Sequence, residues 1–405
     1  MQLSVVDYSL QIDFGSDDDL TDLHATLVDA RRHGAAVVVR YFGRRALLLT
    51  SNELVTEAFQ DEATIPAAAS YRLTTEPVLG TTIQCMEGEE HRRNRALVFP
   101  AFRPRVMPAY LSSILEPLAH ELVDSFAHRG EADLVAEFTR IYPALVIGRL
   151  LGLPAAPEDV QRWAHDLFNY PLDPEGARRS ADEFTGLLAE LVAARRVEPG
   201  DDLLSTLATA EVDGERLADE QIFSFARLLF PAGADTTYLA LGNLLYALLT
   251  HQDQYERVLG DPGTRGWAVE EGLRWEPPVA LLPRVVPDAS HWRGIPVPEG
   301  RLVVLGIAAA NRDPSVYDLP DRFDVDRRAS ATLAFGSGPH YCLGSHLARA
   351  ELEAALGVLL DRLPGLRLVA PERVRIRGVL GGTALRGPDR LPVRFEAPRG
   401  STDLR

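Results

Sequence analysis

The chain has 405 residues, of which 46% are hydrophobic and 25% charged, and its formal net charge is −16 at pH 7. This composition is that of a globular protein with a large core, and it excludes a disordered chain, a collagen-like repeat and a small disulfide-rich scaffold. The acidic balance argues against nucleic acid as a partner, because nucleic acid binds to basic surfaces. At about 150 residues per domain, length alone allows two or three domains.

The N-terminal part predicts a β-hairpin followed by a helix. Two strand-like runs, 35–42 and 46–50, are separated by a short segment that contains a glycine. Ser51 or Asn52 can then cap a helix over residues 53–59. These signals are local, so they predict the elements and not how the elements pack.

The rest of the chain is mostly helical in pattern. From residue 91 to about 249, apolar residues recur at spacings of three and four, and another helical pattern covers 343–360. Strand-like runs return at 302–305 and 391–395. We therefore expect a mainly α protein of the α+β class, with small sheets near its N-terminal and C-terminal parts.

The sequence carries no sign of export or of a membrane anchor. Its first residues have neither a basic start nor an apolar run, and no segment reaches about 18 consecutive apolar residues. Its two cysteines, Cys85 and Cys342, allow at most one disulfide. We expect a cytoplasmic protein in a reducing compartment.

The segment 335–344, Phe-Gly-Ser-Gly-Pro-His-Tyr-Cys-Leu-Gly, is the most informative stretch. It places Cys342 after a glycine-rich turn and before a predicted helix, where backbone N–H groups and the helix dipole stabilise a thiolate. The glycines allow a tight turn and the close approach of a large flat ligand. On these grounds alone, Cys342 suits a nucleophile, a redox sensor or a metal ligand.

This pattern, Phe-Gly-x-Gly-x-His-x-Cys-x-Gly, resembles the haem-binding loop of the cytochrome P450 superfamily of haem-thiolate monooxygenases. The resemblance implies that Cys342 is the axial ligand of haem iron. It also implies that Phe335, His340 and Gly344 lie against the cofactor, which would be haem b.

A second motif supports the resemblance. Glu271 and Arg274 match the family's Glu-x-x-Arg helix, and Pro277-Pro278 follows it as the family pattern requires. Arg322, within Pro-Asp-Arg-Phe, stands where the family has a further arginine. The resemblance implies that the glutamate lies between two arginines and accepts charge-assisted hydrogen bonds that hold the haem-side core together.

A third motif lies in the run from Pro231 to Thr236. Local rules split it into two helices, with Pro231 as a breaker and Asp235 or Thr236 as an N-cap. The resemblance instead implies one long distorted helix, in which the small Ala232 and Gly233 leave room for dioxygen. The Thr236 hydroxyl can then bond to the Ala232 carbonyl, and Asp235 with Thr236 would deliver protons.

Four further residues match positions that bind the haem propionates in the family. His91 and Arg95 are one helical turn apart, while Arg284 and His340 come from later segments. Arginine and imidazole are suitable donors to carboxylates, so the resemblance implies that these four hold the propionates.

Taken together, the motifs imply a monooxygenase that inserts one oxygen atom of O2 into a hydrophobic small molecule by hydroxylation or epoxidation. A single haem domain would cover residues 1–405 without a fused reductase, so NAD(P)H-derived electrons would come through a separate ferredoxin and ferredoxin reductase. A terpenoid, a steroid, a fatty acyl compound or a polyketide would suit the apolar or small side chains at the family's substrate positions. Those positions, apart from the loop 67–85, are Phe230, Ala234, Val279, Leu282, Thr383 and Ala384.

Three alternatives remain open at this point. A haem-thiolate enzyme can couple radicals or use peroxide instead of hydroxylating, and a haem fold can act as a non-catalytic binding module. Cys342 with His340 and His346 would be a poor zinc site, because structural zinc sites usually contain several thiolates.

Overall fold

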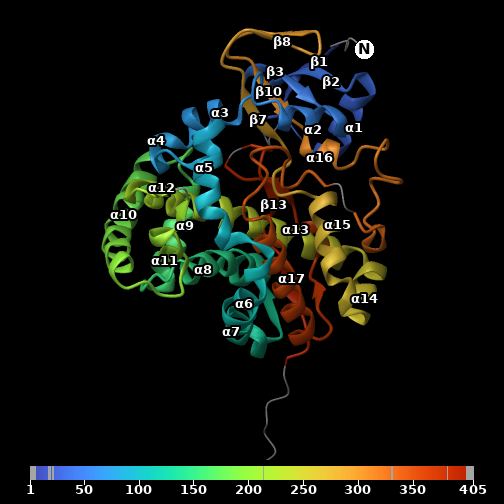
Figure 1. The fold of residues 1–405 in the computed structure, drawn as a ribbon. Helices are drawn as coiled ribbons and strands as arrows, with labels where there is room; N and C mark the ends of the chain where they lie inside the picture. Colours follow the sequence, from blue (N-terminus) through green and yellow to red (C-terminus); the bar gives the residue numbers. More distant parts are fainter. Residues whose placement is uncertain are drawn as a thin grey trace, which may run out of the picture.

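The protein is described by a computed structural model over residues 6–16, 20, 22–212, 214–329, 332–380 and 382–397. A small sheet with α1, α2 and α16 forms one end of the molecule, and a much larger helical part forms the rest (Figure 1). Helices dominate and the sheets are small, so the predicted mainly α class is confirmed.

The largest sheet joins residues from both ends of the chain. Its strand order is β1 (Val6–Asp13), β2 (Ala36–Tyr41), β3 (Arg44–Leu49), β10 (Leu302–Leu305) and β7 (Leu282–Val285). β2 and β3 pair antiparallel, β3 and β10 pair parallel, and β10 and β7 pair antiparallel. This order brings β10, and through it β7, into one sheet with β3, which pairs with β10 although the two strands are far apart in sequence.

The predicted hairpin and helix are both present. Phe42 and Gly43 link β2 and β3 with φ values of 46° and 72°, the positive values of a type I′ turn, which matches the twist of a hairpin. The next helix, α2 (Asn52–Gln60), has Ser51 as its N-cap, and the Ser51 side chain accepts from the backbone N–H of Leu54. Ser51, rather than Asn52, is therefore the cap.

Alternating side chains of the sheet build two separate cores. In β3, Leu47 and Leu49 pack in one cluster, while Ala46 and Leu48 pack in another. Successive residues of a strand point to opposite faces. Both faces are buried, which is why the run reads as continuously hydrophobic.

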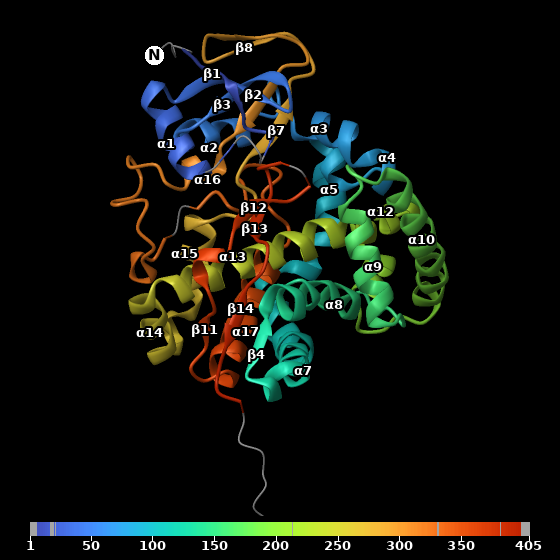
Figure 2. The same cartoon turned by 180° about the vertical axis from the view of Figure 1, so that it is seen from behind.

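The centre of the helical part is one long helical run made of α12 (Asp219–Leu229), η7 (Phe230–Asp235) and α13 (Thr236–Thr250). It crosses the molecule with α8 (Ile141–Leu150) and α17 (Ser345–Arg362) packed beside it (Figure 2). The two separate helices that local rules predict are wrong, and the single long distorted helix that the resemblance implies is confirmed, because the chain stays helical through Pro231. The π winding of η7 widens the turn where proline lacks an N–H donor.

The remaining elements surround this run. The other helices of four or more residues wound as α are α1 (Leu23–His33), α3 (Ala67–Thr74), α4 (Glu76–Leu79), α5 (Gly88–Val98), α6 (Met107–Tyr110), α7 (Glu116–Phe126), α9 (Pro157–Phe168), α10 (Pro174–Val197), α11 (Leu203–Thr209), α14 (Gln252–Gly260), α15 (Arg265–Trp275) and α16 (Ile307–Ala310). The small sheets pair β11 (Arg367–Leu368), β14 (Pro392–Arg394) and β4 (Glu131–Asp133); β12 (Ile376–Gly378) and β13 (Arg386–Pro388); β5 (Glu211–Val212) and β6 (Glu215–Arg216); β8 (Ser290–Trp292) and β9 (Ile295–Val297). Among the described helices, none is both long and apolar enough to cross a membrane.

A buried polar contact joins the N-terminal helix to the centre of the fold. The His24 Nε2 of α1 lies 2.6 Å from the Glu276 Oε2, and the Arg386 Nε lies 3.4 Å from the Glu276 Oε1. Burial alone would raise the pKa of Glu276, but His24, Arg386 and Arg312 outweigh it and lower the pKa to about 2. Glu276 therefore holds three segments together as a carboxylate.

Replacing Glu276 with glutamine is expected to destabilise the protein at neutral pH and to matter less in acid. A carboxylate whose folded-state pKa is lowered stabilises the fold above its ordinary pKa, and this stability is lost as the pH falls through about 4.5 toward 2. The expected loss at pH 7 is on the order of 2–3 kcal/mol. Urea unfolding at several pH values measures it, with the exposed Glu372→Gln as the control. A difference between wild type and variant that stays constant down to pH 3 would contradict this role.

Candidate functional site

The loop before α17 is shaped by glycines that no other residue replaces easily. Gly336 and Gly338 have φ values of 72° and 73°, in the left-handed region that favours glycine. A Cβ on Gly338 would lie 2.8 Å from the carbonyl oxygen of Phe59. The loop closes when the Cys342 N–H donates to the Phe335 carbonyl at 3.0 Å. The predicted tight turn into a helix is therefore confirmed, and it places Cys342 just before α17.

The Cys342 thiol has many protein neighbours, but the residue still has solvent-exposed surface. Burial raises its pKa, while the backbone N–H of Gly344 and the guanidinium of Arg95 act in the opposite direction. The residue is nevertheless exposed, because it lines a hollow of about 440 Å³ together with Arg95 and Phe99. A sulfur in such a place is accessible and has donors that favour its thiolate when a cation binds it.

The four predicted propionate donors gather beside this loop. The rings of His91 and His340 lie face to face, with centroids 4.1 Å apart and planes inclined by 32°. Arg95 reaches the same loop, where its Nη2 donates to the Tyr341 carbonyl at 2.6 Å. The Arg284 Nε and the His91 Nε2 are buried without a hydrogen-bond partner. The structure thus brings together residues from α5, β7 and the cysteine loop, as the motifs predict.

Both histidines are neutral donors. Burial lowers the pKa of His340 to about 3, and the neighbouring His91, Arg284 and Arg95 act in the same direction. Burial and Arg95 likewise lower the pKa of His91. Unpaired buried nitrogen atoms are costly. This cluster therefore has donors suited to an acceptor such as a carboxylate.

The long central helix has exposed surface near its middle, at Ala232. Thr236 Oγ1 donates to the Ala232 carbonyl at 2.7 Å, which confirms the predicted contact between these residues. Ala232 is exposed and its neighbours Pro231 and Gly233 are half-buried, whereas Ala234 and Asp235 are buried. A Cβ on Gly233 would lie 3.1 Å from the Ile147 Cδ1, so the glycine allows α8 to pack closely. Small residues and a back-bonded hydroxyl therefore mark an exposed stretch of η7 around Ala232, which we call the notch.

Asp235 lies next to this notch and is buried. Its Oδ2 has no hydrogen-bond partner. Burial raises its pKa well above the ordinary value, and Arg140 opposes this shift. The Arg140 guanidinium lies 5.4 Å from the Tyr238 ring, and Arg140 is exposed. A carboxyl in this setting can hold a proton at neutral pH close to charged groups that reach solvent.

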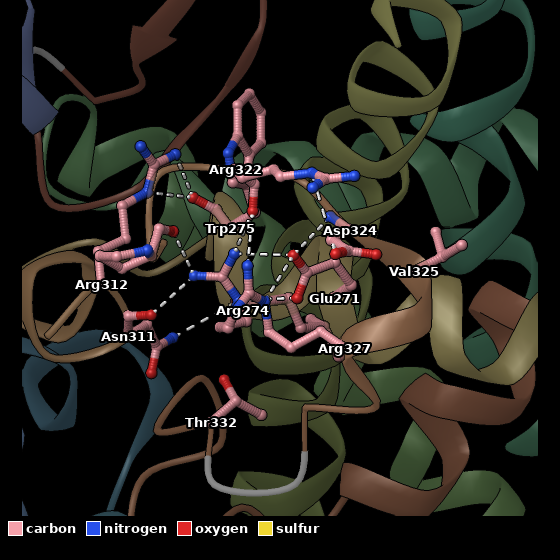
Figure 3. A network of polar contacts seen from close by, with 12 residues as sticks. Glu271, Arg274, Trp275, Asn311, Arg312, Arg322, Asp324, Val325, Arg327 and Thr332 are labelled. Atoms are coloured by element: carbon pink, nitrogen blue, oxygen red, sulfur yellow. Dashed lines mark hydrogen bonds and ion pairs between the residues drawn. The ribbon is translucent and has the colours of Figure 1, made fainter. Parts of the chain in front are cut away.

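Glu271 and Arg274 of α15 form a fully buried pair (Figure 3). The Arg274 Nε and Nη2 each donate to a Glu271 oxygen at 2.7 Å. The same guanidinium donates to the carbonyls of Asn311, Pro320 and Arg322 at 3.0, 2.7 and 3.0 Å. One arginine thus ties α15 to two later loops, as predicted for this motif.

The prediction that the Arg322 side chain is the third member of this network is wrong. Arg322 contributes its carbonyl, but its side chain is 58% exposed and points to Asp324 at 3.9 Å. The Arg327 Nε instead lies 3.4 Å from the Glu271 Oε1, and its Nη2 donates to the Arg322 carbonyl. The turn η9 (Val325–Arg327) folds back and brings Arg327 over the pair, a reversal that sequence spacing alone does not reveal.

Comparison with known proteins identifies the family. The family model described as Cytochrome P450 matches residues 266–364. Mycinamicin IV hydroxylase/epoxidase of Micromonospora griseorubida is 36% identical over 360 residues, covering 87% of this chain and 90% of the relative. For 6-deoxyerythronolide B hydroxylase of Saccharopolyspora erythraea, identity is 33%, covering 95% of this chain and 98% of the relative. This chain belongs to the cytochrome P450 superfamily.

The structural comparison agrees with this assignment. Cytochrome P450 CYP109Q5 from Chondromyces apiculatus has a TM-score of 0.86 at 30% identity, covering 96% of this chain and 98% of the other. The protein therefore has the cytochrome P450 fold and is a cytochrome P450 monooxygenase. Membership implies haem iron, dioxygen and electrons from a reductant as parts of its chemistry.

Two of the segments predicted to contact the substrate of this P450 lie side by side. Val279 forms a β-bridge with Leu385, and the Ala280 N–H donates to the Ala384 carbonyl at 2.8 Å. Val279 and Ala384 are half-buried, as is Leu282 in β7. These three side chains have surface that a ligand can touch.

The other predicted substrate contacts are more enclosed. Phe230 is fully buried, and its ring centroid lies 5.3 Å from that of Phe184 in the core between α10 and η7. Thr383 is also fully buried, and its hydroxyl donates to the Phe14 carbonyl. Ala234 is 3% exposed. In this conformation Phe230 and Thr383 offer no surface to a ligand, so their contact with a substrate stays a prediction.

Three polar residues of the site are not predicted by any sequence motif. Glu62, in the segment between α2 and α3, lies 3.3 Å from the Arg284 Nη1 and 3.6 Å from the His340 Nε2. Arg327 completes the Glu271 network, and Arg140 acts on Asp235. Each reaches the site through a tertiary contact, and none stands in a recognisable motif.

The alternative zinc site is not assembled. Within the described part of the chain, no group of three or more His, Cys, Asp and Glu side chains is arranged to hold a metal ion. Cys342, His340 and His346 therefore do not form such a site.

Proposed function

We propose that Cys342 would bind the iron of haem b as a thiolate and that His91, Arg95, Arg284 and His340 would bind its propionates. The observation that carries this proposal is an accessible thiol beside a cluster of nitrogen donors, two of which are buried and unpaired. A flat cofactor with two carboxylates accounts for both features at once. We further propose that residues 1–405 form one haem domain.

The surfaces at Ala232, Phe335 and Gly344 suit the same cofactor. The notch gives the central helix exposed surface at Ala232, as the approach of a flat ligand and a small gas requires. Phe335 and Gly344 flank Cys342 in sequence, and both are half-buried, which suits contact with a ring. The residues present therefore fit haem.

When bound, haem supplies the oxygen-activating and electron-transfer chemistry. The chain's own residues would supply protons. Burial favours the protonated form of Asp235, which can donate its proton towards Thr236. The carboxyl can then take up another proton from the side on which Arg140 lies. The Thr236 hydroxyl donates to Ala232 at rest and, by rotating, can donate to a reactant in the notch.

The relatives favour a particular class of substrate and electron donor. Two of them are named mycinamicin IV hydroxylase/epoxidase and 6-deoxyerythronolide B hydroxylase, and a third is a polyketide biosynthesis cytochrome P450. We propose a hydrophobic natural product as the substrate, with a polyketide favoured over a terpenoid, a steroid or a fatty acyl compound, and hydroxylation or epoxidation as the reaction. Electrons would come from NAD(P)H through a separate ferredoxin and its reductase.

Replacing Thr236 with alanine is expected to uncouple electron consumption from product formation. The hydroxyl that delivers the proton is lost, so reduced oxygen leaves as hydrogen peroxide. We expect the ratio of product formed to NAD(P)H consumed to fall by about tenfold or more, the scale of a lost proton-transfer group. A screen for haem spin-state shifts first identifies a substrate, and product and peroxide are then measured together.

The same helix provides a matched control for this variant. Thr250, at the end of α13, donates to the Tyr246 carbonyl at 2.7 Å in the same i to i−4 geometry but lies far along the helix from the notch. Thr250→Ala should leave the coupling unchanged. Coupled turnover in Thr236→Ala would overturn the proton-delivery role. Substrate turnover driven by peroxide alone, in wild type, would favour the peroxide-dependent alternative.

A further inference from the structure

A carboxylate lies within the cluster of donors that we propose for the haem propionates. The Glu62 Oε1 lies 3.3 Å from the Arg284 Nη1, and its Oε2 lies 3.6 Å from the His340 Nε2. The Oε2 also accepts from the backbone N–H of Ala67 at 2.9 Å. Both oxygens of Glu62 are thus engaged, and the side chain is only 23% exposed. Its position is therefore held from several sides.

An anion is unexpected at this place. Arg95 and Arg284 are the permanently charged cations of the cluster, because a guanidinium stays protonated in proteins. Two propionates would bring two negative charges to these two cations. Glu62 adds a third negative charge and uses the same donors.

Arg284 does not need Glu62 to stay in place. Its Nη1 also donates to the carbonyls of Ala58 and Ile65 at 3.0 and 2.7 Å. Its guanidinium lies 5.5 Å from the centre of the Phe59 ring, and the side chain is almost fully buried. The carboxylate therefore acts mainly through its charge, because the backbone already positions the arginine.

We propose that Glu62 is an internal counter-anion that partly neutralises Arg284, weakens the hold of the protein on haem and lowers the reduction potential of the haem iron. This inference rests on the proposed function, since it takes the cluster to be the propionate site. Without haem, the carboxylate gives buried Arg284 a partner of opposite charge. With haem, its negative charge favours the ferric over the ferrous state and competes with a propionate for donors.

The test compares two properties of the haem-loaded protein that do not depend on turnover. Glu62→Gln keeps the shape of the side chain and an oxygen acceptor but removes the charge. We expect haem transfer to an excess of apomyoglobin to slow by about two- to fivefold, the effect of one partly exposed charge pair. The ferric/ferrous midpoint potential, measured by spectroelectrochemistry, should become more positive.

Two further variants separate charge from structure. Glu62→Asp keeps the charge and should stay close to wild type in midpoint potential. Glu57→Gln removes the same charge from α2, where Glu57 pairs with Arg293 outside the cluster, and should change neither property.

Faster or unchanged haem loss in Glu62→Gln would overturn the inference, and so would an unchanged or more negative potential. The proposed function is tested separately by the reduced carbon monoxide spectrum of wild type. If wild type shows thiolate-ligated haem and Glu62→Gln behaves like wild type, only the role of Glu62 fails. If wild type binds no haem, both proposals fail.

Discussion

Replacing Cys342 with alanine is expected to abolish the red-shifted Soret band that a thiolate-ligated haem gives as its reduced carbon monoxide complex. The band depends on a sulfur ligand that donates electron density to iron. Cys342 is the accessible cysteine of the two, and its loop is closed by the bond between its N–H and Phe335. Alanine has no atom that can replace the sulfur. Difference spectroscopy of the reduced protein, with and without carbon monoxide, measures the result.

The second cysteine is the control for this experiment. Cys85 is buried, and its sulfur lies 3.5 Å from the Thr82 hydroxyl and 3.9 Å from that of Thr75. Cys85→Ala should therefore keep the red-shifted band. If Cys342→Ala kept the band and Cys85→Ala lost it, the assignment of the ligand would be reversed. If Cys342→Ala bound haem with an unchanged band, a thiolate from Cys342 would not be the ligand.

Local elements of the fold are readable from the sequence, whereas their pairing is not. The hairpin of β2 and β3 and the cap at Ser51 depend on residues close together in the chain. The parallel pairing of β3 with β10 joins Ala46 to Leu302 and cannot be inferred from either run alone. Continuous hydrophobic runs show only that both faces of a strand are buried.

The central helix shows where a local rule fails. Proline removes an N–H donor and usually ends a helix, so Pro231 predicts a break. The structure instead accommodates it in the π winding of η7, against which α8 and α9 pack. Tertiary packing outweighs local propensity here, and the proposed oxygen site at Ala232 lies on the segment where the local rule fails.

In the candidate site, too, some residues are predicted from sequence motifs and others only from tertiary contacts. Cys342, His91 and His340 stand in motifs whose resemblance to the family implies their roles, and the structure places His91 against His340 in the loop that carries Cys342. Glu62 and Arg327 enter through loops that fold back on the site, so no spacing marks them. Sequence motifs therefore supply the groups that we propose to bind or react, and the structure adds the charged groups that lie beside them.

Replacing Arg274 with lysine is expected to destabilise the fold more than any other single change in this network. Arg274 makes two hydrogen bonds to Glu271 and three to backbone carbonyls, and both side chains are fully buried. A lysine has three donors on one nitrogen and cannot match the planar fork that this carboxylate requires. Breaking a buried pair of this kind costs about 3–5 kcal/mol, a large part of a typical total stability of about 5–15 kcal/mol. Urea unfolding and the fraction of purified protein that carries haem measure the effect.

The control distinguishes a buried arginine from an exposed one in the same network. Arg322 contributes only its carbonyl to Arg274, so Arg322→Lys should change stability by less than about 0.5 kcal/mol. The Arg327 side chain reaches Glu271 and is mostly buried, so Arg327→Lys should fall between the two. If Arg322→Lys were as damaging as Arg274→Lys, its side chain would have to reach the pair, against the observed geometry. The order of the three effects therefore tests which arginine side chains hold Glu271. Motif spacing predicts Arg322, whereas the turn at η9 brings Arg327 to Glu271 instead.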